Sequence, residues 1–203
     1  PHKDRPAVVN ASAPLLDADA WPFAWSAAEL NRERNRLLYY ESSRGCPFSC
    51  SYCLSSLDRT VRFRSLDKVL DELDCFIAAK VRQVKLVDRT FNCRPDRANR
   101  IWRYLIERYR AQPHGTCFHF EIAGDLLDDD SLAILQTAPP GLFQFEIGVQ
   151  SAHPFVLRDV NRSSDLAKLA RQVSRLRAAG NCQIHLDLIA GLPGDDLEGF
   201  VRS

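Results

Sequence analysis

Residues 41–53 read Glu41-Ser42-Ser43-Arg44-Gly45-Cys46-Pro47-Phe48-Ser49-Cys50-Ser51-Tyr52-Cys53, and they hold three of the seven cysteines of this 203-residue chain. The C-x3-C-x2-C spacing of Cys46, Cys50 and Cys53 lets three thiolates converge, and Gly45 and Pro47 favour the turn that this needs. Thiolates bind iron–sulfur clusters and soft metals such as zinc. A structural zinc site takes four ligands, whereas a cluster held by three thiolates keeps one iron open. The stretch predicts a cluster with one open position.

The composition is that of an ordinary globular domain. Lys and Arg number 27 against 26 Asp and Glu, so the net charge of +1 gives no indication of a nucleic-acid partner. No apolar run approaches the roughly 20 residues that cross a bilayer, and the start lacks a signal-peptide pattern. An odd number of cysteines, three of them crowded together, suits a reducing compartment. We therefore expect a cytoplasmic protein with no membrane segment.

The chain divides into an arm and a core. Residues 1–35 contain several prolines and the aromatic residues Trp21, Phe23 and Trp25, which predicts an extended linker that packs on a neighbour. The chain contains no methionine and stops where a new helix starts, so we expect a piece of a longer protein. In this interpretation 1–35 is an arm from a missing N-terminal domain, and 36–203 is a core truncated at its C-terminus.

From residue 36 onwards, strand patterns alternate with helix patterns. Short apolar runs predict strands over 37–41, 83–87, 117–123, 142–149 and 182–189. Apolar residues at helical spacing predict helices over 66–77, 98–109, 131–136 and 166–176, and another from about 195. Ser65 is a candidate N-cap, Pro95 lies near a first helical turn, and Gly180 is a candidate C-terminal cap. Strands and helices that alternate in this way indicate parallel βα units.

The strand faces favour a barrel over an open doubly wound sheet. Three strands carry one apolar and one polar face, and the polar faces include His119, Glu121, Glu146, His185 and Asp187. A parallel strand buried on both faces is usually apolar throughout, whereas polar faces that converge on a lumen would line a ligand cavity. We predict an α/β fold, a partial TIM-type (β/α)6 barrel of parallel strands with outer helices.

Polar residues lie where several of these strands end. Asp88 ends the second strand, Glu121 lies late in the third, Gln150 ends the fourth and Asp187 lies in the fifth. Ligands of parallel βα folds bind at the carboxyl ends of the strands. Because the cysteine stretch follows the first strand, we expect the cluster at the same edge.

The cysteine stretch resembles the radical S-adenosylmethionine (radical SAM) superfamily signature, C-x3-C-x-aromatic-C, with Tyr52 in the aromatic place. Two further stretches extend this resemblance. Residues 146–151 read Glu-Ile-Gly-Val-Gln-Ser and are followed by Asn161-Arg162, and residues 187–194 read Asp-Leu-Ile-Ala-Gly-Leu-Pro-Gly. The lead-in to the cysteines, the arm and residues 88–92 look most like the cobalamin-binding subgroup.

The resemblance implies a set of cofactor contacts, Tyr52 of the cysteine motif among them. Cys46, Cys50 and Cys53 would hold a 4Fe–4S cluster, whose open iron binds S-adenosylmethionine (SAM) through its amino and carboxylate groups. Arg162 would bind the SAM carboxylate, because the two parallel N–H groups of a guanidinium match the two oxygens of a carboxylate. Glu121 matches a ribose contact, and Asp187 lies near the nucleoside. By the same resemblance, Gln150 would contact SAM or the substrate. Asp88 would bind the SAM ammonium group, at the place where many relatives have a G-G-E segment.

The same resemblance implies the chemistry. The reduced cluster would split SAM into methionine and a 5′-deoxyadenosyl radical, which takes a hydrogen from the substrate. Such an enzyme needs an electron donor of the flavodoxin or ferredoxin type. Cobalamin, bound by a domain outside this chain, would direct it to methyl transfer or cyclisation. The substrate, a small molecule or a peptide, is not specified by any residue.

Two other classes of protein remain as alternatives. The first is a non-catalytic zinc-binding module with His114 or His153 as fourth ligand, and the second is an iron–sulfur electron-transfer protein that does not use SAM. Of the other cysteines, Cys75 is expected on the apolar face of a helix, and Cys117 and Cys182 open strands. Cys93 is the one candidate for a reactive thiol.

Overall fold

A computed structural model describes residues 10–11, 13 and 15–203. Its main sheet has five parallel strands in the order β1-β4-β5-β6-β7. The bounds are Leu37–Tyr40, Gln83–Leu86, Cys117–Ile122, Phe143–Gln150 and Gln183–Leu188. Spatial order follows chain order, as in a barrel, whereas a doubly wound sheet reverses its order at a switch point. The described residues thus supply five strands of the predicted parallel barrel.

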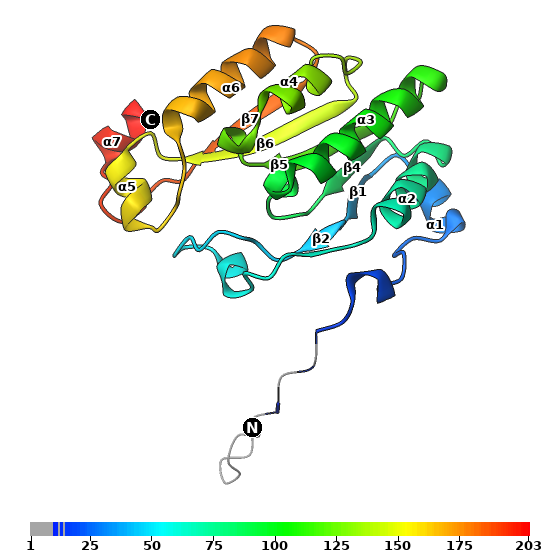
Figure 1. Ribbon diagram of the computed structural model, residues 1–203, viewed down its shortest axis with the longest axis horizontal. Coiled ribbons are helices and arrows are strands. Elements are labelled where there is room, and N and C mark those ends of the chain that lie inside the picture. The colour runs from blue at the N-terminus through cyan, green and yellow to red at the C-terminus, as the bar shows by residue number, and fades with distance from the viewer. Residues whose placement is uncertain (1–9, 12, 14) are drawn as a thin grey trace.

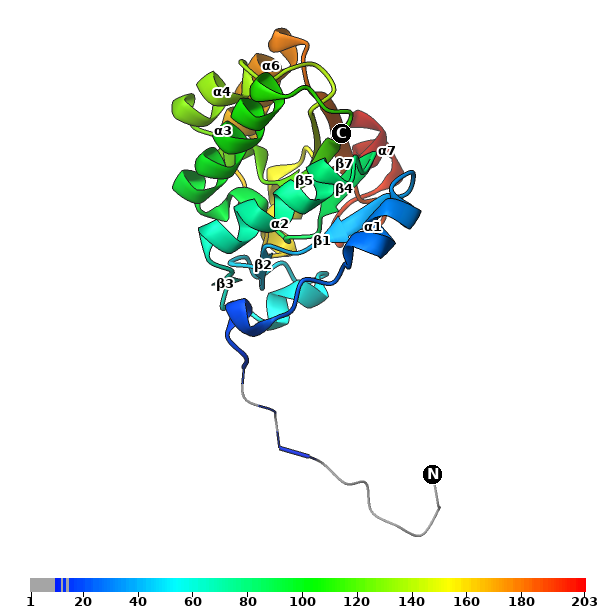
Figure 2. The same cartoon turned by 90° about the vertical axis from the view of Figure 1, so that its right-hand side faces the viewer.

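The helices lie mainly on one face of this sheet (Figures 1 and 2). The long ones are α2 (Leu66–Ala78), α3 (Pro95–Ala111) and α6 (Leu166–Ala179). Shorter ones are α1 (Ala27–Glu33), α4 (Asp129–Leu135), α5 (Pro154–Asp159) and α7 (Leu197–Arg202), with single 3-10 turns η1 (Ala18–Ala20), η2 (Leu54–Leu57), η3 (Phe91–Cys93) and η4 (Gly124–Leu126). In the core, Trp102 of α3 contacts Phe120 and Phe145 edge-on, with ring centroids 6.1 and 5.9 Å apart. Among the described helices, none is both long and apolar enough to cross a membrane.

The predicted helix ends are partly confirmed. Pro95 occupies the first turn of α3, and Gly180 ends α6 in the left-handed conformation with φ of 66°. Ser65 precedes α2, but its side chain makes no capping hydrogen bond. Its backbone N–H donates instead to Asp19 Oδ1 at 2.7 Å, which ties the start of α2 to the N-terminal arm.

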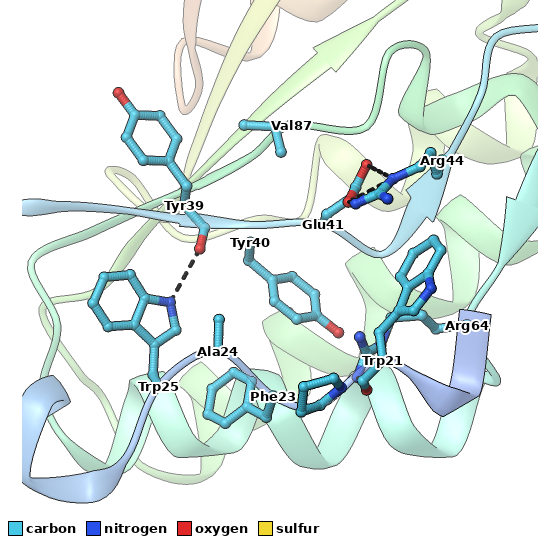
Figure 3. A pocket seen from close by; sticks show the side chains of 11 residues that line it. Trp21, Phe23, Ala24, Trp25, Tyr39, Tyr40, Glu41, Arg44, Arg64 and Val87 are labelled. Carbon is cyan, nitrogen blue, oxygen red and sulfur yellow. Dashed lines mark hydrogen bonds and ion pairs between the residues drawn. The ribbon is translucent and has the colours of Figure 1, made fainter. Parts of the chain in front are cut away.

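The arm is more ordered than the sequence predicted. Residues 1–9, 12 and 14 lie outside the described residues, but Ala27–Glu33 form α1, where Ser26 and Glu29 make a reciprocal capping box. The prediction that the aromatic residues pack on a neighbour is confirmed within the chain (Figure 3). Phe23 packs 5.4 Å from Phe76, and Trp25 Nε1 donates to Tyr39 O at 3.2 Å.

The cysteine loop leaves β1 and is bounded by a small antiparallel hairpin that the sequence did not predict. Its strands are β2 (Ser43–Arg44) and β3 (Arg62–Phe63). Gly45 opens the loop with φ of +100°, and a Cβ on it would lie 2.4 Å from the Thr60 carbonyl oxygen. Only a residue without a side chain fits here, because the neighbouring backbone occupies the space.

Replacing Gly45 by alanine is therefore expected to lower the free energy of unfolding by about 2–3 kcal/mol, since it adds a backbone clash to the cost of a left-handed residue. Gly141→Ala is the matched control. Gly141 also has positive φ, +83°, but no heavy atom lies within 4 Å of its Cβ position, so this variant should lose only about 1 kcal/mol. Urea unfolding followed by circular dichroism measures both values, and equal losses would contradict the assigned clash.

Candidate cofactor site

A cavity opens at the carboxyl ends of the strands, beside the cysteine loop. Its volume is about 130 Å³. The residues that line it are Phe48, Arg89, Thr90, Glu121, Ile122, Ala123, Glu146, Gly148, Gln150, Arg162 and Asp187. Four of the predicted SAM contacts, Glu121, Gln150, Arg162 and Asp187, are thus gathered in one place from three strands and the segment after α5. The sequence had predicted these residues separately.

Arg162 connects the cavity to the cysteine loop. Its Nη2 donates to Gly148 O at 2.6 Å, and its Nη1 lies 3.9 Å from Cys50 Sγ. Its Nε is buried and has no hydrogen-bond partner among the described residues. A buried guanidinium N–H without a partner is costly. A bound carboxylate would supply the missing acceptor, so the donor set of this site fits the carboxylate end of an amino acid.

The segment that follows α5 also holds the cysteine loop in place. Asn161 Nδ2 donates to Ser49 O and Ser49 Oγ at 2.9 and 2.7 Å, and Ser51 N donates to Val160 O at 2.9 Å. Asn161 has φ of 54°, a conformation that asparagine tolerates better than most residues. These contacts fix the backbone around Cys50, and nothing in the sequence pattern had indicated them.

The three cysteines differ in exposure. Cys46 and Cys50 are buried and Cys53 is partly exposed, and Cys46 Sγ lies 3.8 Å from Thr90 Oγ1. Tyr52, in the aromatic place of the motif, is 38% exposed and lies beside Cys50 and Arg162. Burial raises the pKa of its hydroxyl to about 12, so the phenol stays neutral. Tyr52 is not part of the cavity lining, and its contact with a cofactor stays a prediction.

Asp88 lies outside the cavity. It is 1% exposed, and its carboxylate accepts hydrogen bonds from Ser42 N at 3.0 Å, from Ser42 Oγ at 2.7 Å and from Ser43 Oγ. Burial raises its pKa, although these donors and Arg97 act in the opposite direction. Both oxygens are engaged at the start of the cysteine loop, so Asp88 anchors this loop, and its contact with the SAM ammonium stays a prediction.

The end of β6 is distorted at the cavity. The pairing with β7 shifts between Gly148 and Gln150, and Gln150 has φ of 71°. Positive φ is unfavourable for a residue of this kind, and such positions concentrate at functional sites. A Cβ on Gly148 would lie 2.1 Å from Gln150 Nε2. The distortion brings Gln150 into the lining of the cavity, with its side-chain amide packed closely on Gly148.

The polar strand faces converge, as predicted. Lys85 Nζ lies 3.0 Å from Glu121 Oε1 and 2.9 Å from Glu146 Oε2, and His119 Nε2 lies 3.2 Å from Glu146 Oε2. Glu146 and Lys85 were not predicted as site residues. Glu146 lies in the 146–151 stretch of the resemblance, and both residues lie on the polar faces of their strands, so the sequence did contain a signal for them. Lys85 holds two carboxylates together, one of which is the predicted ribose contact.

Replacing Lys85 by methionine should raise the pKa of Glu146. Burial raises this pKa, but the hydrogen bond and charge of Lys85, together with the charges of His119 and His185, lower it further, so that in the wild-type protein it lies below the usual value. Without the Lys85 ammonium, burial still raises the Glu146 pKa, and the nearby Glu121 carboxylate does not lower it. Carboxyl NMR titration of both proteins measures the change. A Glu146 pKa that is the same in the variant as in the wild-type protein would contradict the role of Lys85.

The zinc alternative gains no support from the geometry. His114 precedes β5 and so lies at the amino edge of the sheet, opposite the cysteine loop, where its ring packs on Tyr109 and Phe118. His153 Nε2 is 2.9 Å from Gly199 O. Within the described ranges, no three His, Cys, Asp or Glu side chains are grouped so that they could hold a metal ion. A 4Fe–4S cluster differs in that each thiolate binds a different iron, which sets the sulfurs further apart.

The remaining cysteines are not activated. Burial raises the pKa of Cys93 to about 11, which disfavours the thiolate that a reactive thiol needs, and its reactivity stays a prediction. Cys75 is exposed, so its expected place on an apolar helix face is wrong. Cys117 and Cys182 are partly buried, and burial raises both of their pKa values, that of Cys182 to about 12.

Fold and site together define a class of protein: a parallel βα barrel with a three-cysteine loop and a polar cavity at one mouth. Residues 40–203 match the family model described as Radical SAM superfamily. The chain belongs to this superfamily, whose enzymes use a 4Fe–4S cluster and SAM.

Among curated relatives, a tRNA-2-methylthio-N(6)-dimethylallyladenosine synthase of Nocardioides sp. is 27% identical over 192 residues, covering 88% of this chain and 37% of that protein. The ribosomal protein uS12 methylthiotransferase RimO of Geobacter sulfurreducens is 26% identical over 183 residues, covering 88% and 41%. The chain thus spans about two fifths of these relatives.

Two solved structures share the fold. The radical SAM methyltransferase TsrM from Kitasatospora setae, with cobalamin and a 4Fe–4S cluster bound, gives a TM-score of 0.69 at 19% identity, covering 85% of this chain and 32% of that one. The cobalamin-dependent radical SAM enzyme OxsB, with aqua-cobalamin and SAM bound, gives 0.65 at 18% identity, covering 85% and 26%. At these identities the likeness establishes the fold.

Proposed function

We propose that this chain is the part of a radical SAM enzyme that binds the cluster and SAM. Cys46, Cys50 and Cys53 would hold a 4Fe–4S cluster, and SAM would bind beside the cluster with one end in the cavity. The observation that carries the proposal is the placement of Arg162, with a buried, unpartnered Nε, between Cys50 and the cavity. When bound and reduced, the cluster supplies the electron that splits SAM into methionine and a 5′-deoxyadenosyl radical.

The residues of the chain bind and orient in this scheme. Arg162 would take the SAM carboxylate, and Glu121, steadied by Lys85, would accept hydrogen bonds from the ribose hydroxyls. Asp187, whose pKa is raised by burial and by the nearby Glu146, would lie near the nucleoside, with Gln150 beside it. At about 130 Å³ the cavity is smaller than the roughly 300 Å³ that encloses a whole ligand. We therefore place only part of SAM in it, with the amino acid end extending toward Cys50.

Anaerobic reconstitution with iron and sulfide, followed by EPR of the reduced protein with and without SAM, tests this proposal. A 4Fe–4S signal that changes on addition of SAM, and that Cys50→Ala abolishes, is the expected result. Chromatographic detection of 5′-deoxyadenosine after reduction tests cleavage itself. A cluster indifferent to SAM would support the electron-transfer alternative, and stoichiometric zinc without a cluster would overturn the proposal.

Cobalamin-dependent methyl transfer is a second candidate, because two structures with this fold, TsrM and OxsB, contain cobalamin. In this case cobalamin would be bound outside the described residues and would approach the same mouth. Adding hydroxocobalamin to the chain followed by gel filtration should then leave the cobalamin unbound. Retention of cobalamin by this chain would contradict its assignment to another domain.

A further inference from the structure

A second cavity, of about 370 Å³, lies beside the cysteine loop on the outer side of the barrel, where α2 and α3 begin. Its lining consists of Leu66, Cys93, Arg94, Pro95, Asp96, Arg97 and Arg100. Three arginines face one aspartate, so the lining is net positive. None of these four charged side chains makes an ion pair within the part of the chain that the structure describes.

The arginines are held close together in spite of their like charges. The guanidinium carbons of Arg94 and Arg97 lie 5.2 and 5.4 Å from the centre of the Phe63 ring in β3. Cation–π contacts of this kind position the groups without neutralising them. Arg97 is partly buried, and desolvation lowers its pKa, so its charge is maintained at a cost. The positive ends of α2 and α3 add to the same field, and an anionic partner would relieve this repulsion.

The arginine cavity is also close to the predicted cluster. Cys93, in its lining, donates its backbone N–H to Thr90 O at 3.1 Å, and Thr90 Oγ1 lies 3.8 Å from Cys46 Sγ. Arg97 Nη2 lies 3.5 Å from Ser42 O, at the start of the cysteine loop. A partner seated on the arginines would therefore stand close to Cys46, one of the predicted cluster ligands.

We propose that Arg94, Arg97 and Arg100 form the docking surface for an acidic one-electron carrier protein that reduces the cluster. The inference rests on the proposed function, because only a bound cluster needs this electron. In the step, the carrier loses one electron and is oxidised, and the cluster gains that electron, with no bond formed or broken. Complexes of electron-carrier proteins are often small, below about 1,200 Å² of buried surface, so one charged patch is sufficient to orient them.

The test compares two double variants with the same change in net charge. Arg94→Glu/Arg100→Glu reverses the charge of the surface and should fold, since an acidic residue at position 94 suits the start of α3. Arg82→Glu/Arg171→Glu is the control, because both arginines are exposed and lie elsewhere, at the start of β4 and on α6. The probe is a bacterial flavodoxin. Calorimetry measures its affinity for each protein, and 5′-deoxyadenosine is measured with reduced flavodoxin and, separately, with dithionite.

We expect the surface variant to bind flavodoxin at least about tenfold more weakly and to lose its flavodoxin-driven activity in proportion, with dithionite-driven activity within about twofold of wild type. The control variant should match wild type in flavodoxin affinity, in flavodoxin-driven activity and in dithionite-driven activity. Unchanged flavodoxin affinity in the surface variant, or an equal loss with dithionite, would overturn the inference. The inference would also be overturned if inorganic phosphate bound at the arginines and flavodoxin did not compete with it. If wild type cleaves no SAM even with dithionite, the proposed function fails, while the affinity measurement still decides the docking surface.

Discussion

Asp88→Ala is expected to lower the free energy of unfolding by about 3 kcal/mol or more and to abolish cluster assembly. The substitution leaves the Ser42 N–H and the hydroxyls of Ser42 and Ser43 without their acceptor in a buried site. Each buried polar group left unpaired costs about 1–3 kcal/mol. Because these serines open the loop that carries the cysteines, its backbone should lose its fixed position. Urea unfolding of the protein without cluster measures the first effect, and iron and sulfide content after reconstitution the second.

Two further variants, Asp88→Asn and Asp71→Ala, distinguish the loss of the Asp88 hydrogen bonds from the loss of any one carboxylate. The asparagine keeps the size and one acceptor oxygen but directs an amide N–H₂ at a donor, so its effect should be intermediate. Asp71 is exposed on α2, and its replacement should change stability by no more than about 0.5 kcal/mol. If Asp88→Ala were as stable as Asp71→Ala and still bound a cluster, the loop would not depend on this carboxylate. A normal cluster with weakened SAM binding would instead support the ammonium contact implied by the resemblance.

Arg162→Ala should weaken SAM binding by about 2 kcal/mol or more, roughly thirtyfold, since it removes the partly buried guanidinium that we propose binds the SAM carboxylate. Arg162→Lys should give an intermediate loss, because an ammonium keeps the charge but not the fork that reaches both Gly148 O and the ligand. Anaerobic calorimetry with SAM on reconstituted protein measures the affinity.

Arg158→Ala is the control for this prediction. Arg158 belongs to the preceding helix α5, is exposed and lies 3.6 Å from Asp159, so its loss should leave SAM affinity unchanged. Iron and sulfide content must be normal in both variants for the comparison to hold. Wild-type affinity in Arg162→Ala with an intact cluster would show that the guanidinium does not bind SAM.

Local sequence patterns predicted the elements well. Each of the five predicted strands and each of the long helices is present, with ends shifted by a few residues, because alternation and helical spacing record which face each element buries. Helix α1, the short α5 and the β2–β3 hairpin were not predicted. A single helical turn or a two-residue strand carries too little periodicity to be seen, and its stability comes from contacts with other segments.

The sequence by itself determined the family, the parallel barrel and the candidate cluster ligands, because cysteine spacing and strand alternation are local properties. The tertiary structure decided which side chains meet. Asp88 bonds Ser42 across 46 residues, and Asn161 bonds Ser49 across 112. The sequence suggested Asp88 as a ligand contact, and in the fold its carboxylate oxygens accept hydrogen bonds from Ser42 and Ser43 at the start of the cysteine loop. No local pattern records such pairs, since they depend on how separate elements pack; the same holds for the arginines that meet around Phe63.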